Sequence, residues 1–99
     1  MAKIERTGEV TGKSPSEVYE SAVEVFEASG YNVWKKRPIA YLAMVRISVD
    51  GYGVEGNFAA RFTSPTSYIL TLTSEEMLDN QLAKVADTFI SALNEKFSG

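Results

Sequence analysis

Residues 39–63 read IAYLAMVRISVDGYGVEGNFAARFT, and this stretch predicts two antiparallel strands joined by a tight turn. The Asp50–Gly51 pair is typical of two-residue hairpin turns, because such turns need positive φ angles. After the turn, small or hydrophobic side chains alternate with mostly polar ones, which predicts a strand with one face toward a core. The inward positions are expected to be Tyr52, Val54, Gly56, Phe58, Ala60 and Phe62.

The strand before the turn is hydrophobic at both its odd and its even positions. Tyr41, Val45 and Ile47 alternate with Leu42 and Met44, although a half-exposed strand needs hydrophobic residues at every second position only. If the odd set faces the helices, the even set lies on an outer face, where a contiguous apolar cluster marks an interaction surface. That outer face is expected to carry Trp34, Leu42, Met44, Arg46, Ala59, Arg61 and Ile69. The alternative is that the stems of the two arginines cover Leu42 and Met44.

The rest of the chain supplies three more strands and two helices. Ser14, Pro15 and Glu17 predict a helix start with a capping box, and Gly30 predicts the end of that helix. Thr73 and Glu76 form a second candidate capping box, which opens a helix to about Phe97. The hydrophobic stripe of this last helix comprises Leu78, Leu82, Val85, Ala86, Phe89, Ile90, Leu93 and Phe97. The strands are expected at residues 3–11, 31–37, 39–49, 52–63 and 68–73.

The predicted order β-α-β-β-β-β-α defines an α+β fold, a five-stranded antiparallel sheet with two helices on one face, in one domain over residues 1–99. This order resembles the helix-grip or TBP-like architecture of the TATA-box-binding protein repeats and, with extra strands, of START-like lipid carriers. Residues 8–31, GEVTGKSPSEVYESAVEVFEASGY, are similar to the first strand and helix of START-like domains. The chain departs from START-like domains in having fewer strands, and from the TATA-binding family in being acidic.

Composition excludes several classes of site. The 99 residues include no Cys and no His, so thiolate and imidazole ligands and His-dependent catalytic triads are absent, and we expect no metal or cofactor. The net charge of −3 opposes nucleic-acid binding. No apolar run approaches the roughly 20 residues of a membrane span, and the first ten residues have no signal-peptide core. We therefore expect a cytoplasmic protein without a nucleic-acid or membrane partner.

Three motifs have a structural and a functional interpretation. Residues 51–56, GYGVEG, match the dinucleotide fingerprint, but a strand pattern follows instead of a helix, which favours a glycine-rich hairpin. Residues 34–37, WKKR, combine an aromatic ring with cations, and a charged edge strand explains them better than a nucleic-acid site. The acidic ridge of the first helix is interpreted as a solvated face, and it comprises Glu17, Glu20, Glu24 and Glu27.

Two binding functions follow from these patterns, and neither involves catalysis. The first hypothesis is a binding or assembly domain whose outer sheet face packs on a second copy or on a protein partner. The alternative is a binder of a small apolar, lipid-like ligand, with the pocket between the sheet and the last helix. The expected lining of that pocket is Tyr19, Phe26, Tyr52, Phe58, Phe62 and Phe89. No residue spacing supports an enzyme.

Overall fold

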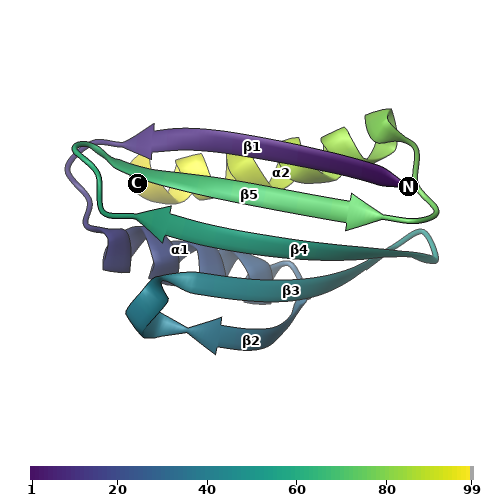
Figure 1. Cartoon of the computed structure of the whole chain (residues 1–99), viewed down its shortest axis with the longest axis horizontal. Helices are drawn as coiled ribbons and strands as arrows, with labels where there is room; N and C mark the ends of the chain where they lie inside the picture. Colours follow the sequence, from purple (N-terminus) through teal and green to yellow (C-terminus); the bar gives the residue numbers. More distant parts are fainter. Residues whose placement is uncertain (99) are drawn as a thin grey trace.

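The computed structural model describes residues 1–98, and in it two helices cover one face of a five-stranded antiparallel sheet (Figure 1). The sheet order is β1-β5-β4-β3-β2. The predicted α+β order is confirmed. The elements are β1 (Ala2–Val10), α1 (Pro15–Ala28), β2 (Asn32–Arg37), the 3₁₀ turn η1 (Pro38–Ala40), β3 (Leu42–Val49), β4 (Tyr52–Arg61), β5 (Thr66–Ser74) and α2 (Asp79–Ser98).

The central hairpin forms as predicted, but its first strand is shorter. Asp50 and Gly51 have φ angles of 52° and 84° and join β3 to β4 in the turn. Residues 39–41, expected in the strand, lie outside it, because Pro38 begins a 3₁₀ turn that ends with Tyr41 in the left-handed region (φ 55°). Ile39 is 98% exposed in that turn. The hydrophobic stretch therefore contributes a strand only from Leu42 onward.

Helix α1 begins with the predicted capping box. The Glu17 amide donates to the Ser14 hydroxyl (3.2 Å), and the Ser14 amide donates to the Glu17 carboxylate (3.1 Å). These hydrogen bonds with Ser14 lower the pKa of Glu17, because they favour its charged form. Gly30 follows the end of the helix with a φ of 79°, as expected of a helix stop. Local sequence signals thus fix both ends of α1.

Helix α2 begins later than predicted, so the Thr73–Glu76 capping box is wrong. Thr73 belongs to β5, where it pairs with Lys3 of β1 and Glu55 of β4. The turn after β5 is closed by Ser74, whose hydroxyl accepts a hydrogen bond from the Met77 amide (3.1 Å). Leu78 precedes the helix and is 67% exposed, whereas the other members of the predicted stripe are buried or half-buried.

The core lies between the helices and the sheet and is centred on three aromatic rings. Phe26 of α1 stacks on Phe89 of α2 with ring centroids 4.2 Å apart. Phe58 of β4 meets both rings edge-on, at 6.4 and 5.9 Å. Each such buried side chain contributes about 1.5–3 kcal/mol. No helix within residues 1–98 is both long and hydrophobic enough to cross a membrane.

Candidate functional site

The two faces of β3 explain its doubly hydrophobic sequence. Ala43, Val45 and Ile47 are buried beneath the helices. Leu42 and Met44 point to the opposite face of the sheet, which no helix covers, and both are half-buried there. We call this uncovered side of the sheet the open face; it faces the viewer in Figure 1.

The structure brings all seven predicted partner-binding residues to the open face. Leu42, Ala59 and Ile69 pair in one row across β3, β4 and β5. Trp34, Met44, Arg46 and Arg61 surround that row on the same side of the sheet. The hydrophobic members other than Trp34 are half-buried, and the two arginines are exposed.

Trp34 is the most exposed hydrophobic side chain among these seven residues, at 46%. It sits at a break in the β2–β3 register between Val33 and Lys35. The Arg46 guanidinium lies 4.8 Å from the centre of the Trp34 ring and also pairs with Glu55 at 3.7 Å. The Arg46 side chain therefore covers part of Trp34. A shallow hollow of about 230 Å³ adjoins this ring, with Met44, Asn57 and Thr71 among its lining residues.

The predicted aromatic pocket is not formed as expected. Tyr19, Phe26, Phe58 and Phe89 are buried, and three of them contact one another in the core. Two of the six predicted residues lie elsewhere. Phe62 is 84% exposed because β4 ends at Arg61 and the strand alternation ends with it. Tyr52 is 37% exposed because it directly follows the hairpin turn.

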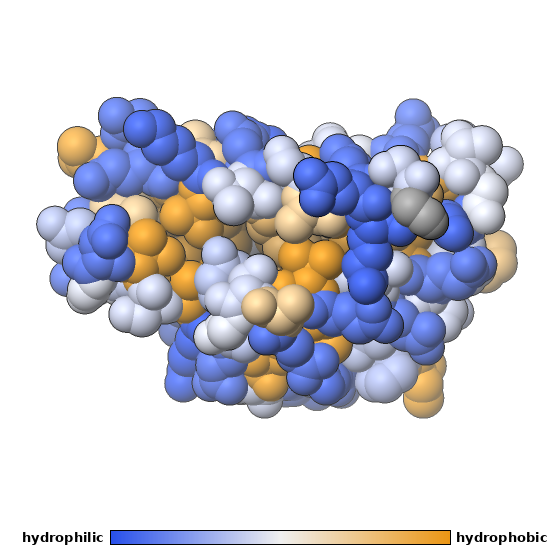
Figure 2. Space-filling view, turned by 180° about the vertical axis from the view of Figure 1, so that it is seen from behind, coloured by the Kyte–Doolittle hydropathy of each residue, from blue (hydrophilic) through white to orange (hydrophobic). Residues whose placement is uncertain are grey.

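A groove instead opens beside α2, near the turn that joins β3 and β4. It has a volume of about 420 Å³, and we call it the α2 groove. Met77 and Val85 are its buried residues, and Tyr31 and Val49 are half-buried beside them. On the helix side of the molecule, hydrophobic residues reach the surface in hollowed places bordered by hydrophilic ones (Figure 2). The full lining of the α2 groove is Tyr31, Val49, Asp50, Met77, Gln81, Lys84, Val85 and Thr88.

The rim of the α2 groove is polar. Gln81, Lys84 and Thr88 line up on one face of α2, because residues three and four apart are neighbours on a helix. The Thr88 hydroxyl donates to the Lys84 carbonyl (2.8 Å), and the Gln81 side-chain oxygen accepts from the Leu78 amide (2.9 Å). Within residues 1–98, no carboxylate lies within 4.0 Å of the Lys84 ammonium group. Sequence patterns missed this groove, because its residues come from four separate segments.

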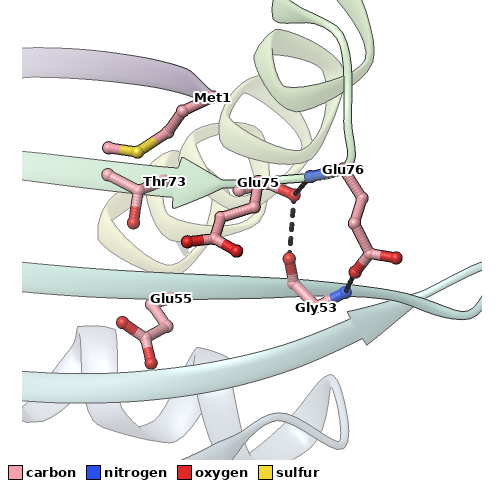
Figure 3. Close-up of a pocket in the computed structure, with 7 residues that line it drawn as sticks. Met1, Gly53, Glu55, Thr73, Glu75 and Glu76 are labelled. Atoms are coloured by element: carbon pink, nitrogen blue, oxygen red, sulfur yellow. Dashed lines mark hydrogen bonds between the residues drawn. The ribbon is translucent and has the colours of Figure 1, made fainter.

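A third hollow, of about 460 Å³, lies where β4 begins and β5 ends (Figure 3). The Glu76 carboxylate accepts from the Gly53 amide (3.2 Å), and the Ser74 hydroxyl donates to the Gly53 carbonyl (2.8 Å). Glu55 and Glu75 also line the hollow, but the three carboxylates do not converge on one point (Figure 3). Residues 1–98 contain no group of three or more acidic side chains that could hold a metal ion. The hydrogen bonds here brace the end of the sheet.

The three remaining motifs have structural roles. Residues 51–56 form the hairpin turn and the start of β4, without a following helix. The WKKR cations divide between the two sides of the sheet: Lys35 pairs with Met44 in the ladder, whereas Lys36 forms a salt bridge with Glu27 of α1 (3.6 Å). The acidic ridge also gains a partner from α2, because Lys96 pairs with Glu24 at 2.6 Å.

Comparisons with known proteins find a likeness in structure only. No family model matches the sequence, and no curated protein matches it. The crystal structure of Ara h 8.0201, a Bet v 1-like protein, is 8% identical and superposes with a TM-score of 0.53 over 96% of both chains. TTHA0849 from Thermus thermophilus is 14% identical, with a TM-score of 0.50 over 97% of this chain and 92% of that one. The fold is helix-grip-like. Identities this low show the fold alone.

The helix-grip-like architecture places the two candidate sites on opposite sides of one sheet. The α2 groove lies on the helix side, and the open face lies on the other side. The space between the sheet and the last helix is occupied by the stacked rings of Phe26 and Phe89. The α2 groove lies at the edge of this interface.

Proposed function

We propose that this chain is a non-catalytic binding domain that holds a small amphipathic molecule in the α2 groove. The main support for this proposal is one observation: the α2 groove has an apolar floor and a polar rim, and it lies at the edge of the sheet–helix interface. Its volume of about 420 Å³ lies within the range of roughly 300–1,000 Å³ that is typical of small-molecule sites. Met77 and Val85 supply the apolar floor. The helix-grip-like neighbours support a binding role by analogy of fold.

The rim favours a ligand with a negatively charged end group. The Lys84 ammonium group has no carboxylate partner among residues 1–98, and Gln81 offers amide donors one turn earlier on α2. Asp50 lies on the other side of the groove, where it disfavours a second negative charge. A single carboxylate on an apolar chain of moderate length satisfies these groups.

The tyrosine hydroxyls support the non-catalytic part of the proposal. The chain has no His and no Cys, so tyrosine, lysine and carboxylates would have to transfer protons. Burial raises the pKa of Tyr68, and burial together with the nearby Glu20 raises that of Tyr19. A tyrosine hydroxyl with the ordinary pKa of 10.0 is already protonated at neutral pH, and the upward shift makes Tyr19 and Tyr68 still weaker acids.

The test is binding of three probes with the same chain and different end groups: decanoate, decanol and decyltrimethylammonium. We expect isothermal titration calorimetry to rank decanoate first. Thr88→Trp fills the groove from an exposed helix position and should weaken decanoate binding about tenfold or more. Ser91→Trp adds the same ring one turn further along α2, outside the groove, and should leave binding unchanged. Absence of binding by all three probes, or equal loss in both variants, would refute the proposal.

A second candidate function, binding of a protein partner by the open face, is favoured by a separate observation. Leu42, Met44, Ala59 and Ile69 form a contiguous apolar centre, and exposed charged side chains surround it. An apolar centre with a charged rim is the usual composition of a protein interface. This function and ligand binding use different surfaces, so the chain can carry both.

A further inference from the structure

We propose that two copies of this chain pack open face to open face, related by a twofold axis that runs along β4. The two chains would form a four-layer arrangement, with the helices outside and the two sheets in contact. Face-to-face sheets pack about 10 Å apart, close enough for side chains from both to interdigitate. This inference depends on the open face alone and is independent of the α2 groove.

The apolar residues of the open face are self-complementary about this axis. Leu42 and Ile69 lie in one row, on either side of Ala59 of the central strand β4. A twofold rotation about β4 exchanges the two sides of the row, so Leu42 meets the partner's Ile69 and Ala59 meets the partner's Ala59. The same rotation places Met44 over the partner's Thr71, because both pair with Asn57 of β4. Every copy of Leu42 thus gains an aliphatic contact that its own chain does not provide.

The charges at the two edges of the open face are complementary under the same rotation. Lys35 and Arg37 lie on the β2 edge, and the β1 edge carries Glu5 and Glu9 together with Lys3, which pairs with Glu5 in its own chain at 3.4 Å. Lys35 and Glu5 belong to one row, which crosses the sheet through Met44, Asn57 and Thr71. The rotation therefore places each Lys35 over the partner's Glu5, where the added cation shares the Glu5 carboxylate with Lys3.

Like charges meet at two positions on the axis. Glu55 of β4 approaches the partner's Glu55, but Arg46 pairs with it in its own chain at 3.7 Å. Arg61 faces the partner's Arg61, but it lies at the last position of β4, at the rim of the surface. The rim tolerates a solvated arginine.

The open face is large enough for a specific dimer. Five strands spaced about 4.8 Å apart and 6–10 residues long give a footprint of roughly 600 Å² per copy. A standard interface buries about 800 Å² per partner, and weaker assemblies bury less. The footprint therefore predicts a dimer of moderate affinity.

The sheet edges do not offer an equally good contact. β2 has only six residues, a register break, and the cations Lys35, Lys36 and Arg37. β1 carries charged side chains along its length, and its Arg6 is bound to Asp87 of α2 at 3.0 Å. Short, irregular and charged edges resist pairing with another strand. Association through the faces is therefore favoured over extension of the sheet.

The test measures the dimer dissociation constant by sedimentation equilibrium. Leu42→Glu places a carboxylate against the partner's Ile69 and should abolish the dimer. Ile39→Glu makes the same change at an exposed position of η1, outside the strands, and should leave the dimer intact. A wild-type chain that stays monomeric at high concentration, or a Leu42→Glu variant that dimerises like the wild type, would overturn the proposal.

A charge swap tests the orientation of the two copies. Lys35→Glu and Glu5→Lys should each weaken the dimer about tenfold, because each places like charges over one another. The double variant keeps the net charge at −3 and should dimerise more tightly than either single variant. Recovery is partial because Lys3 loses its partner Glu5. Lys35 and Glu5 lie on opposite edge strands, so a salt bridge within one chain cannot explain the rescue. A double variant as weak as the two single variants would exclude the twofold axis along β4.

Discussion

The ring of Tyr68 on β5 occupies the space in which a side chain of Gly8 on β1 would lie. The two residues are partners in the β1–β5 ladder. A Cβ atom added to Gly8 would clash with the Tyr68 hydroxyl oxygen and stand 2.5 Å from its ring. The ring also stacks on Phe58, with centroids 5.4 Å apart, so it has little room to move. The missing side chain at Gly8 is thus part of the packing of the sheet.

Gly8→Val should destabilise the protein by about 1–3 kcal/mol, because it overpacks a filled site. The change is measured as the free energy of unfolding in urea. Thr7→Val adds a β-branched side chain at the neighbouring, outward-facing position and serves as the control. Equal stability of the two variants would contradict the close contact between Gly8 and Tyr68.

The stability of the protein should fall as the pH rises above 10. Burial raises the pKa of Tyr68 above its ordinary value of 10.0, so the unfolded chain releases this proton at a lower pH than the folded chain. The protonated Tyr68 hydroxyl therefore contributes fully to the free energy of unfolding below pH 10, and this contribution is lost as the pH rises through the folded-state pKa of Tyr68. Tyr68→Phe should make the alkaline decline shallower in urea titrations at a series of pH values. Ile47→Val removes a buried methylene and no ionisable group, so its decline should parallel that of the wild type.

Ser74→Ala should cost about 1–3 kcal/mol, because it removes the partner of a buried polar group. The Ser74 hydroxyl donates to the Gly53 carbonyl and accepts from the Met77 amide, and Ser74 itself is buried. Hydrogen exchange at the Met77 amide should become faster, and the increase should be larger than the loss of global stability alone would cause. Ser48→Ala changes an exposed serine at the outward side of β3 and should leave both measurements unchanged.

Ser14→Ala should lower stability at neutral pH by about 1 kcal/mol, through loss of the α1 cap. The loss of stability caused by Ser14→Ala should be smaller at acidic pH. Because hydrogen bonds in the folded state lower the pKa of Glu17, its carboxylate stabilises the fold above the unfolded-state pKa of about 4.5. This stabilisation is lost as the pH falls through the folded-state pKa of Glu17. Ser16→Ala changes an exposed serine in the same turn and serves as the control. The free energy of unfolding of both variants is measured in urea at neutral and at acidic pH. A cost independent of pH would show that Glu17 does not act through Ser14.

Local signals predicted most of the fold, and they failed where a distant strand competed with them. Asp50 and Gly51 dictated their turn because the required φ angles depend on those two residues alone. Thr73 resembled a helix cap, but β1 and β4 on either side extended the sheet through it. Phe62 continued the alternation of β4, yet no partner strand extends that far. Pairing between strands therefore decided both boundaries.

The sequence by itself determined the order of the elements and the doubly hydrophobic character of β3, because periodicity and turn chemistry are properties of neighbouring residues. Only the tertiary structure decided which distant residues share a surface. Lys35 and Glu5 share a row because the ladder order is β1-β5-β4-β3-β2. Val49 and Lys84 border one groove because α2 packs beside the β3–β4 turn. Both relationships depend on burial of the common core, to which segments far apart in the chain contribute together.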